Sequence, residues 1–385
     1  MPDVAIVGVG EADEMGSVPH KSALQMHAEA ARNALDDAGI PLSEVDAYLT
    51  CGNDFMPTLV MGEYIGLRPD VYMDSTSIGG SSFVAHVEHA LHLIRSGIAN
   101  VALITHGETR RANAKRGVRP RPASDDPLYP DAQFEHLYGL SLAAPPFYAM
   151  SCSRHMHEYG TTSEQLAEIA VATRGWAQKN PKAFIRDPLT IEDVLASPML
   201  AYPLHVLDCC LVTDAGGAVV VTSAQRAKAT RKSPVWVLGA GSAFTHLNIT
   251  TMPDLTVTPA AISGPKAFGE AGVKPDEIDV AEIYDSFTYT VLVVLEDLGF
   301  CEKGEGGAFV SDQRTAPGGD FPLNTSGGGL SYTHPGMFGV FLLIEATRQL
   351  RGECGDRQVE GARLGCVNGT GGYLSSTATL ILGAD

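Results

Sequence analysis

The chain repeats itself, and this internal repeat constrains the fold more than any other feature of the sequence. Five segments recur in the second half in the same order: an apolar strand ended by glycines, a helix end with the strand after it, a glycine pair leading into a helix, and two more strands. The paired segments are residues 4–10 and 235–241, 34–46 and 267–279, 79–95 and 328–350, 99–105 and 362–368, and 218–222 and 378–382. This order predicts an α/β fold of two duplicated strand-helix-strand halves, each a sheet covered by helices.

A long segment without a counterpart interrupts the first copy. Residues 106–208 are rich in proline at their start and carry a helical pattern over 163–179. We therefore expect an N-terminal half made of residues 1–105 and 209–232, and a C-terminal half of residues 233–385. Residues 106–208 are expected to form an inserted loop domain that covers one face of the first half.

Charge and cysteine usage exclude several classes of protein. A formal net charge of −18 at pH 7 argues against binding to nucleic acid or to an anionic membrane, because phosphate contacts need a basic face. No apolar run approaches the length of a membrane span. The seven cysteines form no Cys-x-x-Cys pair, so no zinc site or disulfide framework is predicted, and their odd number fits a reducing compartment. We expect a cytoplasmic protein without a metal.

Residues 324–339, with the sequence NTSGGGLSYTHPGMFG, combine a glycine triplet with two side chains that transfer protons. The glycines allow close approach of a ligand to the main chain, so the N–H groups of residues 327–329, Gly328 and Gly329 among them, are candidates to bind an oxyanion. Tyr332 and His334 follow directly and can act as acid or base. The plain alternative is a glycine-rich turn with a surface tyrosine and a capping histidine.

The two halves, the insertion of about a hundred residues and the Gly-Gly-x-x-x-x-x-His-Pro-Gly motif ending at Gly336 together resemble the thiolase superfamily. Within it, the insertion is similar to that of sterol-carrier-protein-type thiolases, as in the segments NPKA from Asn180 and PLHVLDCC from Pro203. The resemblance covers the whole chain. It implies a thiolase-like fold of two duplicated βαβαβαββ halves in a layered α/β/α/β/α arrangement. It also implies a homodimer formed through the first-half sheet.

The chain departs from that family where the family places its catalytic cysteines. The position of the acyl-accepting thiol falls on Gly80, and no cysteine lies between residues 52 and 151. Ser81 or Ser82 could replace the thiol only with a base beside it. The family's His-Asp-Cys-Phe motif corresponds to Tyr284-Asp-Ser-Phe, so a second catalytic cysteine is also replaced.

These losses make the chain similar to the thiolase-like aldolases of steroid side-chain degradation. The resemblance implies a lyase that cleaves a bulky β-hydroxyacyl-CoA into a ketone or aldehyde and propionyl-CoA or acetyl-CoA. It also implies a DUF35 partner, an OB-fold and zinc-ribbon protein, in an α2β2 complex, with no cofactor other than the coenzyme A of the substrate. The alternatives are an acyltransferase that uses a serine or Cys366, and a non-catalytic subunit.

A retro-aldol cleavage needs a base for the β-hydroxyl, a group that holds the enolate and an acid for the α-carbon. We expect Tyr284 and Tyr332 to form the acid/base pair, with His334 polarising the thioester carbonyl or lowering the pKa of a tyrosine. Asp285 is expected to orient a loop. Tyr373 is expected to line the pocket.

The densest basic cluster of this acidic chain lies early in the insertion. Its members are Arg110, Arg111, Lys115, Arg116, Arg119 and Arg121. Arginine suits phosphate because its planar fork matches phosphate geometry, so the first four are candidates to bind the phosphates of coenzyme A. A solvated face or an oligomer contact is the alternative.

Overall fold

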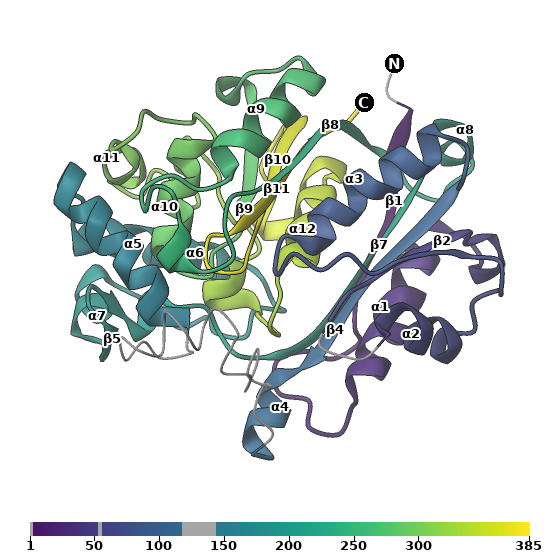
Figure 1. Ribbon diagram of the computed structural model, residues 1–385, viewed down its shortest axis with the longest axis horizontal. Coiled ribbons are helices and arrows are strands. Elements are labelled where there is room, and N and C mark those ends of the chain that lie inside the picture. Colours follow the sequence, from purple (N-terminus) through teal and green to yellow (C-terminus); the bar gives the residue numbers. More distant parts are fainter. Residues whose placement is uncertain (1–2, 53–55, 118–143) are drawn as a thin grey trace.

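The computed structural model describes residues 3–52, 56–117 and 144–385, and its centre is a nine-stranded sheet in the order β3-β2-β4-β7-β1-β8-β11-β10-β9 (Figure 1). The first five strands come from the first half of the chain and the last four from the second half. They are β1 (Val4–Glu11), β2 (Ala47–Leu49), β3 (Tyr72–Asp74), β4 (Val101–Thr109), β7 (Asp214–Ser223), β8 (Val235–Phe244), β9 (Val280–Ile283), β10 (Leu364–Gly371) and β11 (Ser376–Gly383).

The order of the strands reproduces the sequence repeat. Reading outward from the β1/β8 junction, β7, β4 and β2 correspond to β11, β10 and β9. The counterpart of β3 is a single parallel bridge between Ala281 and Leu323. The two half-sheets are joined by only two residue pairs, Ala5 with Trp236 and Ile6 with Val235. The predicted duplicated α/β fold is confirmed.

Two helices lie between the half-sheets and two cover the outside. The central helices α3 (Ser82–Arg95) and α12 (Gly339–Arg351) contact each other and strands of both halves. The outer helix α1 (Ala23–Ala38) packs on β1, β4 and β7, and α9 (Ala260–Ala271) packs on β8 and β11. Figure 1 shows α3 and α12 at the centre of the molecule. Their first turns therefore bring loops of both halves together.

The Gly-x-Gly pair within each repeated strand, at residues 8 and 10 of β1 and 239 and 241 of β8, allows close packing between helix and strand. A Cβ placed on Gly8 would overlap the carbonyl oxygen of Ala34 in α1, and one on Gly239 would overlap that of Ala267 in α9. The outer helices approach the sheet so closely because these strand positions carry no side chain. The repeated glycines therefore mark equivalent helix–strand contacts.

The described helices α5 and α6 of the insertion cover the second half, whereas the sequence suggested that the insertion covers the first half. Helices α5 (Ala144–Tyr159) and α6 (Ser163–Lys179) pack on α10 (Thr288–Asp297), and α6 also packs on α11 (Gly306–Val310). Every residue of α10 is buried, so this helix needs a cover on each side. Figure 1 shows α5 and α6 beside α10.

The remaining elements are short. They are α2 (Pro57–Ile65), α4 (Arg110–Lys115), α7 (Ile191–Ala196), α8 (Ala224–Ala227) and the hairpin of β5 (Met199–Ala201) and β6 (Leu204–His205). Among the described residues no helix is both long and apolar enough to cross a membrane.

Replacing Gly8 or Gly239 by alanine is expected to lower the free energy of unfolding by about 1–3 kcal/mol, because the added methyl group overlaps helix backbone. Gly269→Ala in α9 is the matched control, since nothing lies within 4 Å of its Cβ. It should leave stability unchanged or raise it by up to about 1 kcal/mol through helix propensity. Urea unfolding followed by circular dichroism measures all three, and unchanged stability in the first two variants would contradict the packing argument.

Candidate active site

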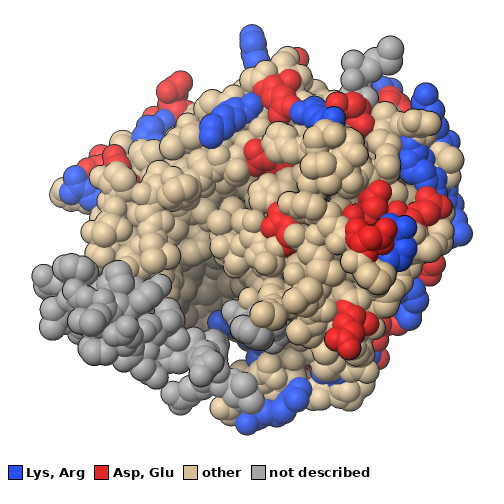
Figure 2. Space-filling view, turned by 45° about the vertical axis from the view of Figure 1, so that its right-hand side comes forward, with Lys and Arg blue, Asp and Glu red and all other residues tan. Residues whose placement is uncertain are grey.

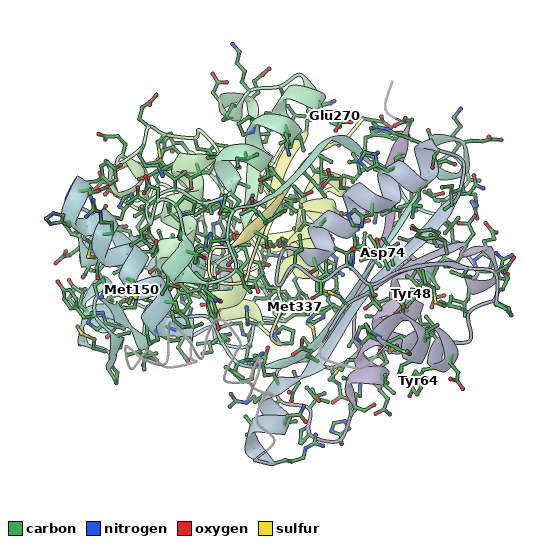
Figure 3. The ribbon with its side chains drawn as sticks, viewed as in Figure 1. Tyr48, Tyr64, Asp74, Met150, Glu270 and Met337 are labelled. Carbon is green, nitrogen blue, oxygen red and sulfur yellow. The ribbon has the colours of Figure 1, made fainter. Side chains whose placement is uncertain are left out.

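Loops from both halves, together with Arg110 and helix α5 of the insertion, enclose a cavity of about 290 Å³. The side chains that line it and bear on its chemistry are Arg110, Tyr148, Cys210, Tyr284, His334, Met337 and Thr370. Met337 marks its position near the centre of the molecule (Figure 3). The space-filling view shows one face hollowed, and the visible wall of the hollow is mostly uncharged (Figure 2).

A hydrogen-bonded tyrosine–histidine pair forms the chemical centre of the cavity. The Tyr284 hydroxyl lies 2.9 Å from Nε2 of His334 and accepts the N–H of Phe338 at 3.1 Å. Because Tyr284 already accepts from Phe338, we assign its own proton to the bond with His334, which places the imidazole proton on Nδ1. Thr213 fixes the histidine: its hydroxyl accepts the His334 N–H at 2.8 Å, and its N–H donates to the His334 carbonyl at 3.2 Å.

Burial keeps both members of the pair neutral. Burial, together with the smaller effect of the nearby Arg110 guanidinium, lowers the pKa of His334 to about 4. Burial also raises the pKa of the Tyr284 hydroxyl well above its usual range. At neutral pH the tyrosine is therefore a proton donor, and Nε2 of His334 holds a lone pair.

Asp285 orders the glycine-rich loop, as the sequence suggested, and this removes the predicted oxyanion donors. Its buried carboxylate accepts the N–H groups of Gly329 at 2.7 Å and Leu330 at 3.0 Å, and burial raises its pKa to about 6. The N–H of Gly328 donates to Ser326 Oγ, and that of Gly327 donates to the Asn324 carbonyl. The expectation that this loop binds an oxyanion is corrected, because these donors already have acceptors within the protein.

Tyr332 lies apart from Tyr284, contrary to the expected pairing. Its buried hydroxyl donates to Glu11 Oε1 at 3.0 Å, and the Glu11 carboxylate also accepts from Arg348 and from Lys182. Tyr332 is not among the described residues that line the cavity. The structure therefore gives Tyr332 a role in fixing the end of the loop against β1.

The Tyr284 ring occupies the space that a side chain at position 80 would need. A Cβ placed on Gly80 would overlap the ring of Tyr284 and the carbonyl oxygen of Thr370. The Tyr284 ring therefore leaves no room for a cysteine side chain at position 80. A cysteine at position 80 would require Tyr284 to move.

The two serines beside Gly80 are occupied by structural hydrogen bonds. Ser81 Oγ donates to the Ile78 carbonyl at 2.8 Å and lies 2.9 Å from Ser376 Oγ. Ser82 Oγ donates to the Gly79 carbonyl at 2.6 Å and accepts the Ile78 N–H at 2.9 Å. Neither serine is among the described residues that line the cavity. The expectation that they contribute to the pocket is corrected.

Three cavity residues were missed by the sequence analysis. Tyr148 donates to the Gly372 carbonyl at 3.0 Å, and burial raises its pKa to about 12. Cys210 lines the cavity as a thiol whose pKa burial raises. The Thr370 hydroxyl is buried and has no hydrogen-bond partner among the described residues. In the sequence, the only signals that could have identified these residues are the adjacent cysteines 209 and 210 and the position of Thr370 near the end of a strand. Tyr373 instead packs on the Phe147 ring at 4.4 Å between centroids.

Among the described members of the basic cluster, only Arg110 lines the cavity. Arg111 lies over the Phe184 ring at 5.0 Å and donates to the Val212 carbonyl. Lys115 Nζ donates to Ser17 Oγ at 3.3 Å, and Arg116 donates to the Pro19 carbonyl at 3.5 Å. These three hold α4 to neighbouring loops. Arg119 and Arg121 lie outside the described residues.

Comparisons with known proteins agree with this architecture. A family model described as Thiolase C-terminal domain-like matches residues 241–384. The chain is 35% identical to an acetyl-CoA acetyltransferase of Methanothermobacter thermautotrophicus, with 99% of each chain covered. It is 34% identical to a steroid side-chain-cleaving aldolase of Thermomonospora curvata, with 99% of this chain and 98% of the relative covered.

A lyase and a solved structure extend these comparisons. The 17-hydroxy-3-oxo-4-pregnene-20-carboxyl-CoA lyase of Mycobacterium tuberculosis is 36% identical, with 90% of this chain and 91% of the relative covered. The solved Ltp2-ChsH2(DUF35) aldolase superposes with a TM-score of 0.88 at 31% identity, covering 100% of this chain and 98% of the other.

The protonation of the pair can be tested by NMR of histidine-labelled protein. His334 is expected to stay neutral, with its proton on Nδ1, down to about pH 5, because burial lowers its pKa to about 4. Its neutral form adds stability that is complete above the pKa of the unfolded chain and is lost as pH falls toward 4. Tyr284→Phe should shift the Nε2 resonance by removing its donor, with His20, 61% exposed, as internal reference. An imidazolium at pH 7 would contradict the assignment.

Proposed function

The chain belongs to the thiolase superfamily, and on this premise we propose that it is a lyase that cleaves a bulky β-hydroxyacyl-CoA by a retro-aldol reaction. The observation that carries the proposal is the Tyr284–His334 pair. The ring of Tyr284 fills the space beside Gly80, where a thiolase needs its nucleophile. A retro-aldol cleavage forms no covalent intermediate with the enzyme, so it needs no thiol there.

The names of the relatives indicate the substrate class. The M. tuberculosis lyase is named for 17-hydroxy-3-oxo-4-pregnene-20-carboxyl-CoA, whose hydroxyl lies β to the thioester. A retro-aldol reaction on such a compound gives the 17-ketone and propionyl-CoA. A steroid side-chain β-hydroxyacyl-CoA is therefore the substrate that we propose for this chain, with propionyl-CoA or acetyl-CoA as the acyl product.

In the proposed reaction, protons move along the hydrogen bond between Tyr284 and His334. The substrate β-hydroxyl gives its proton to the Tyr284 oxygen while the tyrosine proton moves to Nε2 of His334, 2.9 Å away. The bond between the α- and β-carbons breaks, and its electron pair enters the thioester enolate. The proton then returns through Tyr284 to the α-carbon. The low pKa of His334 favours a concerted transfer over a long-lived imidazolium.

Two other cavity side chains suit the thioester and its coenzyme. The unpartnered Thr370 hydroxyl can donate to the enolate oxygen as charge develops there. Arg110 is the member of the basic cluster placed to attract the phosphates of coenzyme A. No cofactor other than the coenzyme A of the substrate enters the proposed reaction.

The proposed assembly is a homodimer that binds a DUF35 protein in an α2β2 complex. Within the described residues β3 pairs only with β2, so its outer edge is free, and Tyr72 on β3 is 44% exposed. A free edge suits pairing with a second copy. The DUF35 partner is supported by the similarity to the Ltp2-ChsH2(DUF35) aldolase.

An acyltransferase is the second candidate, because two relatives bear that name and the Cys210 thiol lines the cavity. Burial raises the pKa of Cys210, which disfavours the thiolate that acyl transfer needs. Cys366 is fully buried in β10, and burial raises its pKa to about 12. Both observations favour the lyase.

The decisive assay mixes the protein, alone and with a DUF35 partner, with the steroid β-hydroxyacyl-CoA and follows propionyl-CoA and ketone. Tyr284→Phe is expected to lower kcat by about 10²–10⁴-fold, because it removes the proton relay. Tyr332→Phe should leave kcat nearly unchanged and lower the free energy of unfolding by about 1 kcal/mol, because its hydroxyl bonds Glu11. Equal collapse in both variants would instead assign Tyr332 to the reaction. If the wild type released neither product, the lyase would be excluded for this substrate.

Cys210→Ala separates the lyase from the acyltransferase. The variant is expected to retain lyase activity within about threefold of the wild type, because a thiol kept protonated by burial takes no part in proton transfer. Cys366→Ala is the matched control in the core. CoA-dependent cleavage of a β-ketoacyl-CoA that disappears in Cys210→Ala would establish the acyltransferase. Inactivity of the wild type in both assays would favour a non-catalytic subunit.

A further inference from the structure

We infer that a second, apolar cavity beside the catalytic one binds the fused-ring part of the substrate; the inference rests on the proposed lyase function. The catalytic cavity and this second cavity, of about 430 Å³, share Gly79 and Gly372 in their linings. A ligand can therefore extend from one into the other. Both volumes are of the order found in ligand pockets.

The second cavity differs in chemistry from the first. Apolar side chains dominate its lining, with Ile78, Phe244 and Leu247 the largest. No Asp, Glu, Lys or Arg of the described chain lines it, and burial lowers the pKa of its one histidine, His246, so that residue is neutral at pH 7. Arg110 lines only the catalytic cavity. The pair of cavities thus suits a molecule with an anionic end and an uncharged, apolar end.

The apolar wall is held in place although its side chains face solvent. Phe244 is 79% exposed and Leu247 is 60% exposed. The backbone of their loop is fixed by three hydrogen bonds: the Thr245 N–H to the Ser375 carbonyl at 3.1 Å, Ser375 Oγ to the Leu247 carbonyl at 2.9 Å, and His246 Nε2 to the Tyr373 carbonyl at 3.0 Å. Large apolar side chains on a fixed loop form a preorganised binding surface.

The same hydrogen bonds couple the two cavities. Ser375 and Tyr373 follow Gly371 and Gly372, which line the catalytic cavity beside Tyr284. A ring system seated on Leu247 is therefore positioned relative to the reacting bond by one short segment of chain. This arrangement suits cleavage next to a bulky, rigid group.

The test compares Leu247→Asp and Phe244→Asp with Ile262→Asp, a control on α9 that is 44% exposed and lines neither cavity. Two substrates with the same reacting atoms are used, the steroid β-hydroxyacyl-CoA and 3-hydroxy-2,3-dimethylbutanoyl-CoA, which releases acetone. Leu247→Asp and Phe244→Asp are expected to lower kcat/KM for the steroid by about 10- to 100-fold, because apolar contacts of one ring edge are lost. Activity on the small substrate should stay within about twofold of the wild type.

A binding measurement keeps this inference separate from the proposed function. Equilibrium dialysis with the 17-ketone androst-4-ene-3,17-dione is expected to show binding to the wild type and to Ile262→Asp, and loss in Leu247→Asp. If neither substrate is cleaved but this pattern holds, the lyase proposal fails and the ring site stands. Equal loss of activity on both substrates, or ketone binding unaffected by Leu247→Asp, would overturn the ring site. A smaller oligomer of Leu247→Asp in light scattering would overturn it too, and would assign the surface to a subunit contact.

Discussion

The ring of Tyr284 lies against the α-carbon of Gly80, where no side chain could be added without displacing it. The hydroxyl of the same residue contacts His334 and the N–H of Phe338, at the start of the central helix α12. Loops of both halves of the chain are thereby joined through one side chain. Most of the cavity's chemistry follows from this contact, because it excludes a nucleophile at position 80, fixes the imidazole tautomer and sets a proton donor beside a lone pair.

Two buried carboxylates hold the loop that carries His334. Asp285 accepts two N–H groups from the turn that begins at Gly328, and Glu11 accepts from Tyr332 at its end while paired with Arg348. Burying these charges is acceptable because each is compensated by donors or by a cation. The loop that the sequence suggested as an anion-binding element is thus itself bound by anionic side chains. Its N–H groups stabilise the fold, whereas the buried hydroxyl of Thr370 has no hydrogen-bond partner among the described residues.

The duplicated halves explain why the site can form between them. The central helices α3 and α12 are equivalent in the repeat, and each begins with a glycine-containing loop. Because both helices lie between the half-sheets, their first turns face a common space. The insertion then closes this space with Tyr148 from α5, which packs on Phe287 at 4.3 Å between ring centroids. The insertion lies at this place because α10 is buried on every side and the elements of the second half alone do not cover that helix.

The sequence by itself determined the repeat, the order of its elements, the absence of a cysteine between residues 52 and 151, and the glycine-rich segment that carries Tyr332 and His334. These features are local patterns or short spacings, which periodicity and composition record directly. The tertiary structure decided the partners of the long-range contacts. The Tyr332 hydroxyl bonds Glu11, 321 residues away in the sequence. Among the described members of the basic cluster, only Arg110 lines the cavity. Spacing along a chain does not encode such distances, because they depend on how helices and sheets pack.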